Sequence, residues 1–280
     1  MAGSGALPVR EGPVRIVSWN LHAMAGSDGR SDPERIARVV EQLGADVAGL
    51  QEVGTPALPP GVADPAALLA ALTGMRSAFG ATMHHRLGFA YGNAVLSRHP
   101  IQAIRNYDLS VPGREPRGCV RADVELGDAV VHFFAAHLGL HWRERRRQAA
   151  QLLSADILRD AALAHPLVLV GDFNSISNRS AVPRWLRRQL VDCALDASNE
   201  APTFPSAFPL LRLDHCYVDA AFRVVAVEVH RSRLARRASD HLPLVVELEL
   251  LPVARRPPAA RQVETSGVST VLRPARRPVG

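Results

Sequence analysis

The chain has 280 residues, of which 47% are hydrophobic and 21% charged, a composition typical of a globular protein with a sizeable core. The net charge is +6 and all 33 basic residues are arginine, but the stretch from residue 252 onward carries six arginines and one glutamate. The rest of the chain is therefore close to neutral, which argues against a surface that is basic throughout and built for nucleic acid. Three scattered cysteines exclude a disulfide framework or a cysteine-rich zinc site.

The pattern predicts three segments: a short leader at 1–13, one domain at 14–251, and a disordered basic tail at 252–280 that is rich in Pro and Arg. The first residues lack the basic start and continuous apolar stretch of a signal peptide, and no apolar run approaches the roughly 20 residues that span a bilayer. We therefore expect a cytoplasmic protein, and a monomer. The basic tail favours contact with anionic lipid or nucleic acid, or is a solvated extension without a function.

The residue pattern of the domain predicts many strands with interspersed helices. The helix at 32–43 is announced by Ser31-Asp32-Pro33-Glu34, a start signal with Pro in the first turn. Several predicted hairpins, and no Gly-rich phosphate loop after any strand, favour an α/β sandwich over a doubly wound parallel sheet. In chain order, strands are expected at 14–19, 46–51, 80–85, 91–97, 101–107, 118–126, 129–138, 167–170, 213–218, 222–230 and 243–251, with helices at 32–43, 65–73, 141–163 and 183–189.

Polar side chains stand where six of these strands begin or end. A carboxylate at the end of an apolar strand is costly unless it is paired, hydrogen-bonded or coordinated. Six such edges are hard to explain as independent turns. The edges carry Asn20 in IVSWN, Glu52 in VAGLQE, His137 in VVHFFAAHLG, Asp172 and Asn174 in LVLVGDFN, Asp214 in RLDHCYV, and Asp240 and His241 in SDHLPL.

In this order, WN, LQE, GNAVLS, AHL, GDFN, RLDH and SDHLPL resemble the endonuclease/exonuclease/phosphatase superfamily, which has the fold of deoxyribonuclease I. The resemblance covers about residues 14–250 and is closest to a compact bacterial branch. It implies a four-layer α/β sandwich, in which two packed, mainly antiparallel sheets are flanked by helices. It also implies a metal-dependent phosphodiesterase or phosphatase.

The resemblance also assigns metal-binding roles. Glu52 is the best candidate ligand, because its hard oxygen donors suit Mg²⁺ or Mn²⁺; alone, it would be an ordinary surface glutamate after a strand. By resemblance Asp240 is a second, water-mediated metal contact. Asn20 is expected to orient the ligand or the phosphate.

Catalytic roles follow from the same resemblance. Asp172 orients or deprotonates the attacking water, and Asn174 holds water and phosphate, both on one side of an extended edge. His241 contacts the scissile phosphate and Asp214 hydrogen-bonds its other ring nitrogen. His137 binds phosphate or protonates the leaving group, although the sequence shows no acidic partner for it.

Two further residues are candidate phosphate contacts. Asn93 in YGNAVLS either aids phosphate or metal binding or is a hairpin-edge residue. Arg143 belongs to HWRERRRQ, which either clamps phosphate groups or forms a solvated helix face.

The expected activity is hydrolysis of a phosphodiester, in a phospholipid head group or a small phosphate ester, by an activated water. The apolar stretch TFPSAFPLLRLDH, residues 203–215, leads to Asp214 and either meets an acyl chain or bilayer surface or packs as a loop. The alternatives are a DNA or RNA nuclease of the same fold and a catalytically silent binding module, the latter disfavoured because the core catalytic positions are filled.

Overall fold

The computed structural model describes residues 12–56, 58, 64–84, 89–163 and 166–252. The expected leader and basic tail lie almost entirely outside these residues. In the described part, twelve strands form two six-stranded sheets. Each sheet has one parallel pair, β1 with β2 and β7 with β8, and its other neighbours are antiparallel.

The first sheet has the order β11-β12-β1-β2-β4-β3 and the second the order β5-β6-β7-β8-β10-β9. The first sheet contains β1 (Val14–Asn20), β2 (Val47–Val53), β3 (Arg76–His84), β4 (Ala90–Ser97), β11 (Phe222–Val229) and β12 (Leu244–Leu250). The second contains β5 (Ile101–Asp108), β6 (Gly118–Leu126), β7 (Ala129–His137), β8 (Leu167–Asp172), β9 (Val191–Asp192) and β10 (Asp214–Val218).

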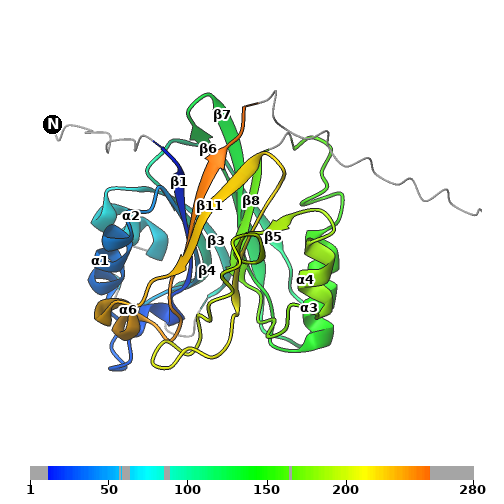
Figure 1. The fold of residues 1–280 in the computed structure, drawn as a ribbon. Coiled ribbons are helices and arrows are strands. Elements are labelled where there is room, and N and C mark those ends of the chain that lie inside the picture. Colours follow the sequence, from blue (N-terminus) through cyan, green and yellow to red (C-terminus); the bar gives the residue numbers. More distant parts are fainter. Residues whose placement is uncertain (1–11, 57, 59–63, 85–88, 164–165, 253–280) are drawn as a thin grey trace, which may run out of the picture.

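Helices cover the outer face of each sheet, so that four layers stack (Figure 1). On the first sheet lie α1 (Pro33–Leu43), α2 (Pro65–Thr73) and α6 (Arg233–Ala238), and on the second α3 (Trp142–Leu152) and α4 (Ala181–Leu186). A short 3-10 helix, η1 (His22–Met24), follows β1, and α5 (Cys193–Asp196) follows β9. The expected sandwich of two mainly antiparallel sheets flanked by helices is confirmed.

Three apolar cores hold the layers together. Between the sheets, Val47 and Val95 of the first pack with Phe133 and Val170 of the second. This contact is tight, because a Cβ placed on Gly49 would lie 2.2 Å from Val170 Cγ2. The other two cores join each sheet to its helices. Burying apolar surface on both faces of the central strands explains why they read as near-continuous runs of Val, Leu and Ile.

The start signal predicted for α1 is confirmed. Asp32 caps the helix by accepting a hydrogen bond from the Arg35 backbone N–H at 2.8 Å, Pro33 occupies the first turn, and Gly44 ends the helix with φ +59°. An aspartate cap, a proline at the first helical position and a left-handed glycine after the last are each locally encoded.

One helix is shorter in the structure than the sequence predicts. α3 ends at Leu152, whereas the expectation was a helix to Leu163, and the chain continues in turns. Ser154 and Asp160 accept hydrogen bonds from backbone N–H groups two residues later, at 3.2 and 2.9 Å. Such local acceptors compete with the helical ladder. Leu152, at the end of α3, and Ile157, in the turns that follow, are both buried in the core under this sheet.

None of the described helices is both long and apolar enough to cross a membrane.

Candidate active site

The polar strand ends meet at one end of the sandwich. β1 and β2 run parallel and bring Asn20 and Glu52 to the same edge, while β7 and β8 run parallel and place His137 opposite Asp172. β10 runs antiparallel to β8, so its first residue, Asp214, pairs with Asp172. Parallel neighbours carry their carboxyl ends to one edge, and an antiparallel neighbour brings its first residue there. The topology therefore assembles the site.

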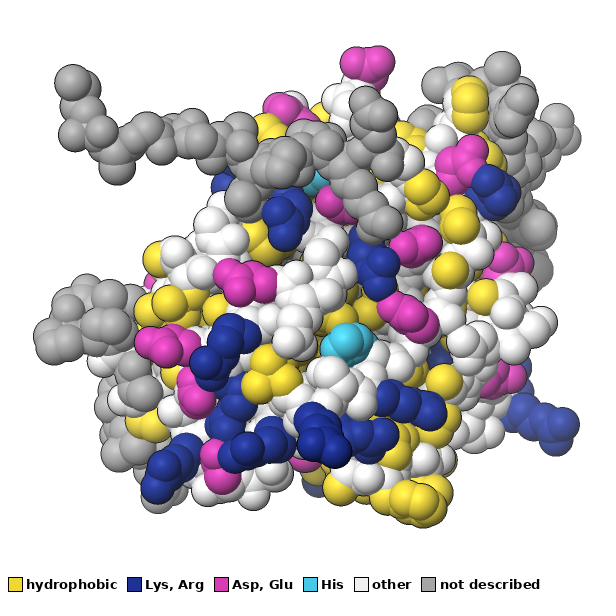
Figure 2. Space-filling view, turned by 60° about the vertical axis from the view of Figure 1, so that its left-hand side comes forward, with side chains coloured by type: hydrophobic (Ala, Val, Ile, Leu, Met, Phe, Trp, Pro, Cys, Tyr) yellow, Lys and Arg dark blue, Asp and Glu magenta, His cyan; other side chains and the backbone are white. Residues whose placement is uncertain are grey.

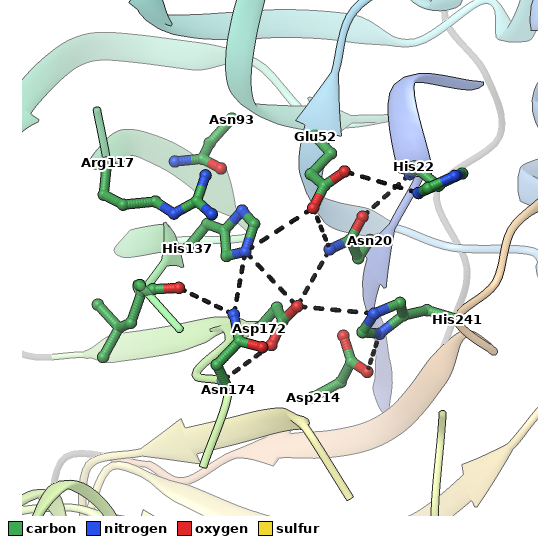
Figure 3. A network of polar contacts seen from close by, with 12 residues as sticks. Asn20, His22, Glu52, Asn93, Arg117, His137, Asp172, Asn174, Asp214 and His241 are labelled. Carbon is green, nitrogen blue, oxygen red and sulfur yellow. Dashed lines mark hydrogen bonds and ion pairs between the residues drawn. The ribbon is translucent and has the colours of Figure 1, made fainter. Parts of the chain in front are cut away.

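Glu52 sits at an irregularity of β2. The pairing of β2 with β4 shifts register between Leu50 and Val53, and Glu52 has φ +53°. A left-handed glutamate costs of order 1–3 kcal/mol, which is typical of functional positions. The bulge directs the carboxylate into the site, where Asn20 Nδ2 donates to Glu52 Oε1 at 3.1 Å (Figure 3).

Asp172 lies at the centre of the network (Figure 3). It is buried, and its Oδ2 accepts a hydrogen bond from Asn20 Nδ2 at 3.0 Å. The Nε2 atoms of His137 and His241 approach the same Oδ2 to 3.6 and 3.7 Å. Burial, followed by the negative charge of Asp214, raises the pKa of Asp172 to about 7. Near neutral pH this carboxylate can both hold and accept a proton.

The backbone conformation at Asn174 differs from the extended one expected. Its φ is +48°, so the chain after Asp172 is not an extended edge, and the expectation of a shared strand face is wrong. The left-handed turn is closed by the Asn174 N–H, which donates to Asp172 Oδ1 at 2.9 Å. Asn tolerates this conformation better than most residues, because its short side chain bonds locally. The turn still aims its side chain at His137, with Nδ2 3.3 Å from His137 Nε2 and 2.9 Å from the Leu138 carbonyl oxygen.

Gly171 serves close packing inside the strand. It pairs with Ala136 and His215 inside β8. A Cβ at this position would lie 2.0 Å from the Ala136 carbonyl oxygen. Only glycine lets the two parallel strands approach closely enough to set His137 beside Asp172.

His241 and Asp214 form a buried pair. His241 Nδ1 lies 2.8 Å from Asp214 Oδ2, and the Thr203 hydroxyl donates to the same oxygen. The His241 ring also packs against Phe204, with centroids 4.8 Å apart, and Trp19 Nε1 donates to the His241 carbonyl oxygen at 2.9 Å. Burial alone would lower the pKa of His241, but Asp214 and the other nearby carboxylates raise it to about 10. The ring is therefore cationic at neutral pH.

His137 has the opposite electrostatic character. Burial, with the positive charge of Arg117, lowers its pKa to about 3, so the ring is neutral at pH 7. The sequence shows no acidic partner for His137, but the structure gives it two. Asp172 Oδ2 lies 3.6 Å and Glu52 Oε1 3.9 Å from His137 Nε2. One cationic and one neutral histidine thus flank a single carboxylate.

The donors around Glu52 suit a hard divalent cation. Its carboxylate remains partly exposed, and burial, which would raise its pKa, is outweighed by His137 and by hydrogen bonds from Asn20 and Tyr91, so the pKa is lowered. Asp240 stands on the open side, its Oδ2 3.5 Å from His22 Nδ1, which lies 4.0 Å from Glu52 Oε2. In the part of the chain that the structure describes, no group of three or more His, Cys, Asp or Glu side chains is arranged to hold a metal ion. Mg²⁺ does not need one, because it binds through one or two carboxylates and keeps several waters. The residues present therefore fit such an ion.

Three residues at the site were missed by sequence reasoning. Arg117 and Tyr91 line one small hollow with Glu52, Asn93 and His137. Arg117 is buried and pairs with Glu115 at 2.7 Å. The only local signal was its place just before a strand, in GREPRGCV.

His22, the third, stands beside Glu52 and Asp240 in η1, with a φ of +48°. In the sequence, its position just after the WN motif is the sign that it lies at the site.

The two candidate phosphate contacts are placed differently. Asn93 is buried in the hollow, where its Nδ2 donates to the Gly118 carbonyl oxygen at 2.8 Å. Arg143 is exposed in the first turn of α3, outside this hollow. The structure thus brings together Asn20, Glu52, Asn93, His137, Asp172, Asn174, Asp214, Asp240 and His241, but not Arg143.

Comparison with known proteins agrees with this geometry. Residues 17–241 match the model of the Endonuclease/Exonuclease/phosphatase family. The uncharacterised protein YbhP of Escherichia coli is 37% identical over 163 residues, which are 57% of this chain and 63% of YbhP. The match thus spans less than two thirds of that relative's length.

Solved structures share the fold. An endonuclease/exonuclease/phosphatase from Beutenbergia cavernae is 27% identical with a TM-score of 0.70, covering 85% of this chain and 72% of the other. The mannosyl-6-phosphatase of Bacteroides thetaiotaomicron is 21% identical with a TM-score of 0.68, covering 85% of this chain and 100% of the other. The family match over most of the domain, together with these likenesses, shows that the chain belongs to the endonuclease/exonuclease/phosphatase family.

Proposed function

We propose that the protein hydrolyses a phosphodiester, in a phospholipid head group or a small phosphate ester, by in-line attack of a water, with Mg²⁺ or Mn²⁺ as cofactor. Its family is one of phosphoesterases and nucleases. The observation that carries the proposal is the buried carboxylate of Asp172, whose Oδ2 lies 3.6 and 3.7 Å from the Nε2 atoms of His137 and His241 and whose pKa is raised to about 7.

Asp172 is the group that takes a proton from the attacking water. A general base works best when its pKa lies near the working pH. The Asn20 and Asn174 contacts fix both of its oxygens, so the base has one orientation. The carboxamide of Asn174 also stands beside His137, where it can hold the water or a phosphoryl oxygen.

His241 supplies positive charge for the phosphoryl oxygens. Its Nδ1 is held by Asp214, which leaves Nε2 facing Asp172 and the open site. Fixed positive charge at this point stabilises the charge that develops on phosphorus-bound oxygens. His137, being neutral, offers a hydrogen bond to the phosphate or to the leaving oxygen.

Glu52 would hold the cation, with Asn20 orienting its carboxylate and Asp240 contributing through water. When bound, Mg²⁺ or Mn²⁺ would neutralise charge on the phosphoryl oxygens. The donor set supports this assignment because its atoms are all hard oxygens apart from the nearby His22 ring.

The proposal of a phospholipid substrate is supported by the surface beside the site. Phe208 and Leu210 are exposed on the loop before Asp214, and Arg236 Nη1 bonds the carbonyl oxygen of Ala207 in that loop at 3.1 Å. Figure 2 shows dark blue side chains along the lower part of the face that carries α1 and α6, at the same end of the molecule. Apolar tips next to arginines suit peripheral contact with an anionic bilayer.

Hydrolysis of nucleic acid is the second candidate. It is favoured by exposed arginines and the exposed Trp142 at the start of α3, close in sequence to His137. Phosphate contacts and stacking on aromatic rings are how single strands are bound.

The test is turnover of bis-p-nitrophenyl phosphate with Mg²⁺, compared among the wild type, Asp172→Ala, His241→Ala and the surface variant Asp156→Asn. We expect both site variants to lose at least roughly 10²-fold in kcat while Asp156→Asn keeps the wild-type rate. Undiminished turnover in both site variants would refute the assignment.

The cation site is tested with Glu52→Gln. The neutral amide keeps the shape but loses the charge, so the Mg²⁺ concentration for half-maximal rate should rise by roughly tenfold or more. An unchanged Mg²⁺ dependence would place the ion elsewhere.

Turnover of plasmid DNA and of phospholipid vesicles, measured with the wild type, decides between the two candidate substrates.

A further inference from the structure

A second hollow opens beside the active site. It lies between the loop that joins β5 to β6 and the first turns of α3, and it encloses about 500 Å³. We call it the anion groove. Its lining residues are Val111, Pro112, Arg114, His141, Trp142, Arg143, Glu144 and Arg147.

The groove carries an excess of positive charge. Arg114, Arg143 and Arg147 are exposed, and within the described residues none of them pairs with a carboxylate. The one acidic lining residue, Glu144, is buried and bonded to Gln148 at 3.3 Å. Arginines whose guanidinium groups have no carboxylate partner are a usual means of binding phosphate.

These arginines differ from those that serve the fold. Arg35 and Arg212 are buried and face Asp28 and Asp192, respectively. Three exposed cations that line one hollow without such partners favour an anionic ligand there.

Trp142 adds a flat apolar surface to the groove. Half of its surface is exposed (51%), and the guanidinium of Arg143 lies over its ring, 5.1 Å from the centroid. Arg146 lies 5.9 Å from the same centroid and 5.4 Å from that of Trp185, which helps hold the arrangement. An exposed indole among cations is typical of a surface that binds a ring next to a phosphate.

The groove shares two chain segments with the small hollow lined by Glu52, Asn93, Arg117 and His137, which we call the catalytic hollow. The β5–β6 loop gives Arg114 to the groove and ends at Arg117 in the catalytic hollow. β7 ends at His137, which lines the catalytic hollow, and His141, which lines the groove, follows four residues later, a span of at most about 14 Å. Arg145 Nη1 donates to the Gly139 carbonyl oxygen at 3.3 Å, and Gln148 Oε1 accepts from the Gly139 N–H at 2.8 Å. This segment is thereby fixed against α3.

We propose that the anion groove binds a second phosphate group of the substrate, next to the phosphate that is cleaved, with a ring of the same molecule against Trp142. This rests on the proposed phosphoesterase activity and narrows its substrate class. A diester with one phosphate leaves the groove empty, and a diester with a second phosphate on an adjoining ring occupies the groove as well as the active site.

The test compares substrates that differ by one phosphate. One pair is the p-nitrophenyl ester of thymidine 5′-phosphate with and without a 3′-phosphate, and the other is glycerophosphoinositol with and without a phosphate on its ring. The proteins are the wild type, Arg143→Gln/Arg147→Gln, Trp142→Ala, and the control Arg38→Gln/Arg105→Gln, which changes two exposed arginines elsewhere.

We expect the second phosphate to raise kcat/KM of the wild type roughly tenfold in at least one pair. The groove arginine variant should lose this ratio, whereas the control should keep both the ratio and the wild-type rate on the substrates with one phosphate. The pair that shows the preference identifies the source of the phosphate, nucleotide or head group. A ratio near one for the wild type in both pairs, or an equal ratio in the groove variant, overturns the proposal.

Binding gives a readout that does not depend on turnover. The affinities of thymidine 3′,5′-bisphosphate and thymidine 5′-phosphate are measured by calorimetry and by Trp142 fluorescence, with Trp142→Ala as the reference. We expect the bisphosphate to bind the wild type roughly tenfold more tightly, and the groove variant to bind the two alike. Equal wild-type affinities, both for these nucleotides and for the inositol head groups of the first test with and without the ring phosphate, overturn the groove, whereas absence of turnover with the preference intact counts only against the proposed function.

Discussion

The charge on His241 depends most on Asp214, which has no exposed surface. Its carboxylate holds the ring through a contact of 2.8 Å and is the first of the charges that raise the ring's pKa. This arrangement orients the ring and keeps it cationic, as in other histidine–carboxylate pairs. The site thus depends on a residue that need not touch the substrate.

Replacing Asp214 by Asn should lower kcat for a phosphodiester by roughly 10²-fold or more, because the charge on His241 and its orientation are both lost. Inorganic phosphate, as a competitive inhibitor, should also bind more weakly. Steady-state kinetics and phosphate inhibition measure the two effects.

The chain offers a matched control. Asp123 Oδ1 lies 2.7 Å from His132 Nδ1 on the same sheet, and His132 pairs with Leu167 at the start of β8, five residues from Asp172. Asp123→Asn removes a comparable pair and should leave kcat and phosphate inhibition unchanged. Equal losses in the two variants would mean that Asp214 acts only through stability.

The parallel pair β7–β8 places His137 against Asp172, and its register is set by close backbone contact at Gly171. Two polar strand ends can meet only if their strands are adjacent, in register and close. β1 and β2 do the same for Asn20 and Glu52 on the other sheet. The two sheets meet at the site, since Asn20 Nδ2 bonds carboxylates that belong to both.

Gly171→Ala should separate β7 and β8 locally. The new Cβ meets the Ala136 carbonyl oxygen, and overpacking of this kind destabilises by about 1–3 kcal/mol. We expect both a lower midpoint of denaturant unfolding and a lower kcat, measured by circular dichroism and by the phosphodiester assay. Gly127→Ala, at a glycine with nothing within 4 Å of an added Cβ and φ +61°, is the control: it should lose some stability through backbone strain but keep its kcat.

The whole molecule is held by three apolar cores, and a buried polar pair lies beneath the site. Asp192 is buried and accepts a hydrogen bond from Arg212, and His215 lies 3.9 Å from its other oxygen. Burial would raise the pKa of Asp192, but His215 and Arg212 lower it to about 2. The charged form is therefore favoured in the folded state.

This pair should contribute to acid unfolding. A carboxyl whose folded pKa is depressed adds stability above its unfolded pKa of 3.8 and loses it as the pH falls toward 2. The shift corresponds to about 2 kcal/mol. Asp192→Asn should thus lower the free energy of unfolding by at least about that amount at pH 7, and the gap to the wild type should narrow between pH 4 and 2. Denaturant unfolding across this range measures the gap, and a gap independent of pH would contradict the assignment.

Most of the strands, the start of α1 and most of the side chains that meet at the candidate site were predictable from the sequence, because their signals are local. Apolar periodicity marks a strand, Asp32-Pro33 marks a helix start, and a carboxylate after four apolar residues marks an unusual strand end. α6, with six residues, is too short to show a helical period, and the length of α3 depends on local acceptors that interrupt it. Those elements could not be read from periodicity.

Only the tertiary structure decided which polar groups share a hollow and what charge each carries. Arg117 reaches the site from a loop whose sequence carries no catalytic pattern, and it is one reason that His137 is neutral. The opposite states of His137 and His241 follow from burial and from neighbours distant in the chain, such as Asp214. Residue identity sets what a side chain can do, whereas dielectric surroundings and distances of a few ångströms set its pKa, and these exist only once the sheets have packed.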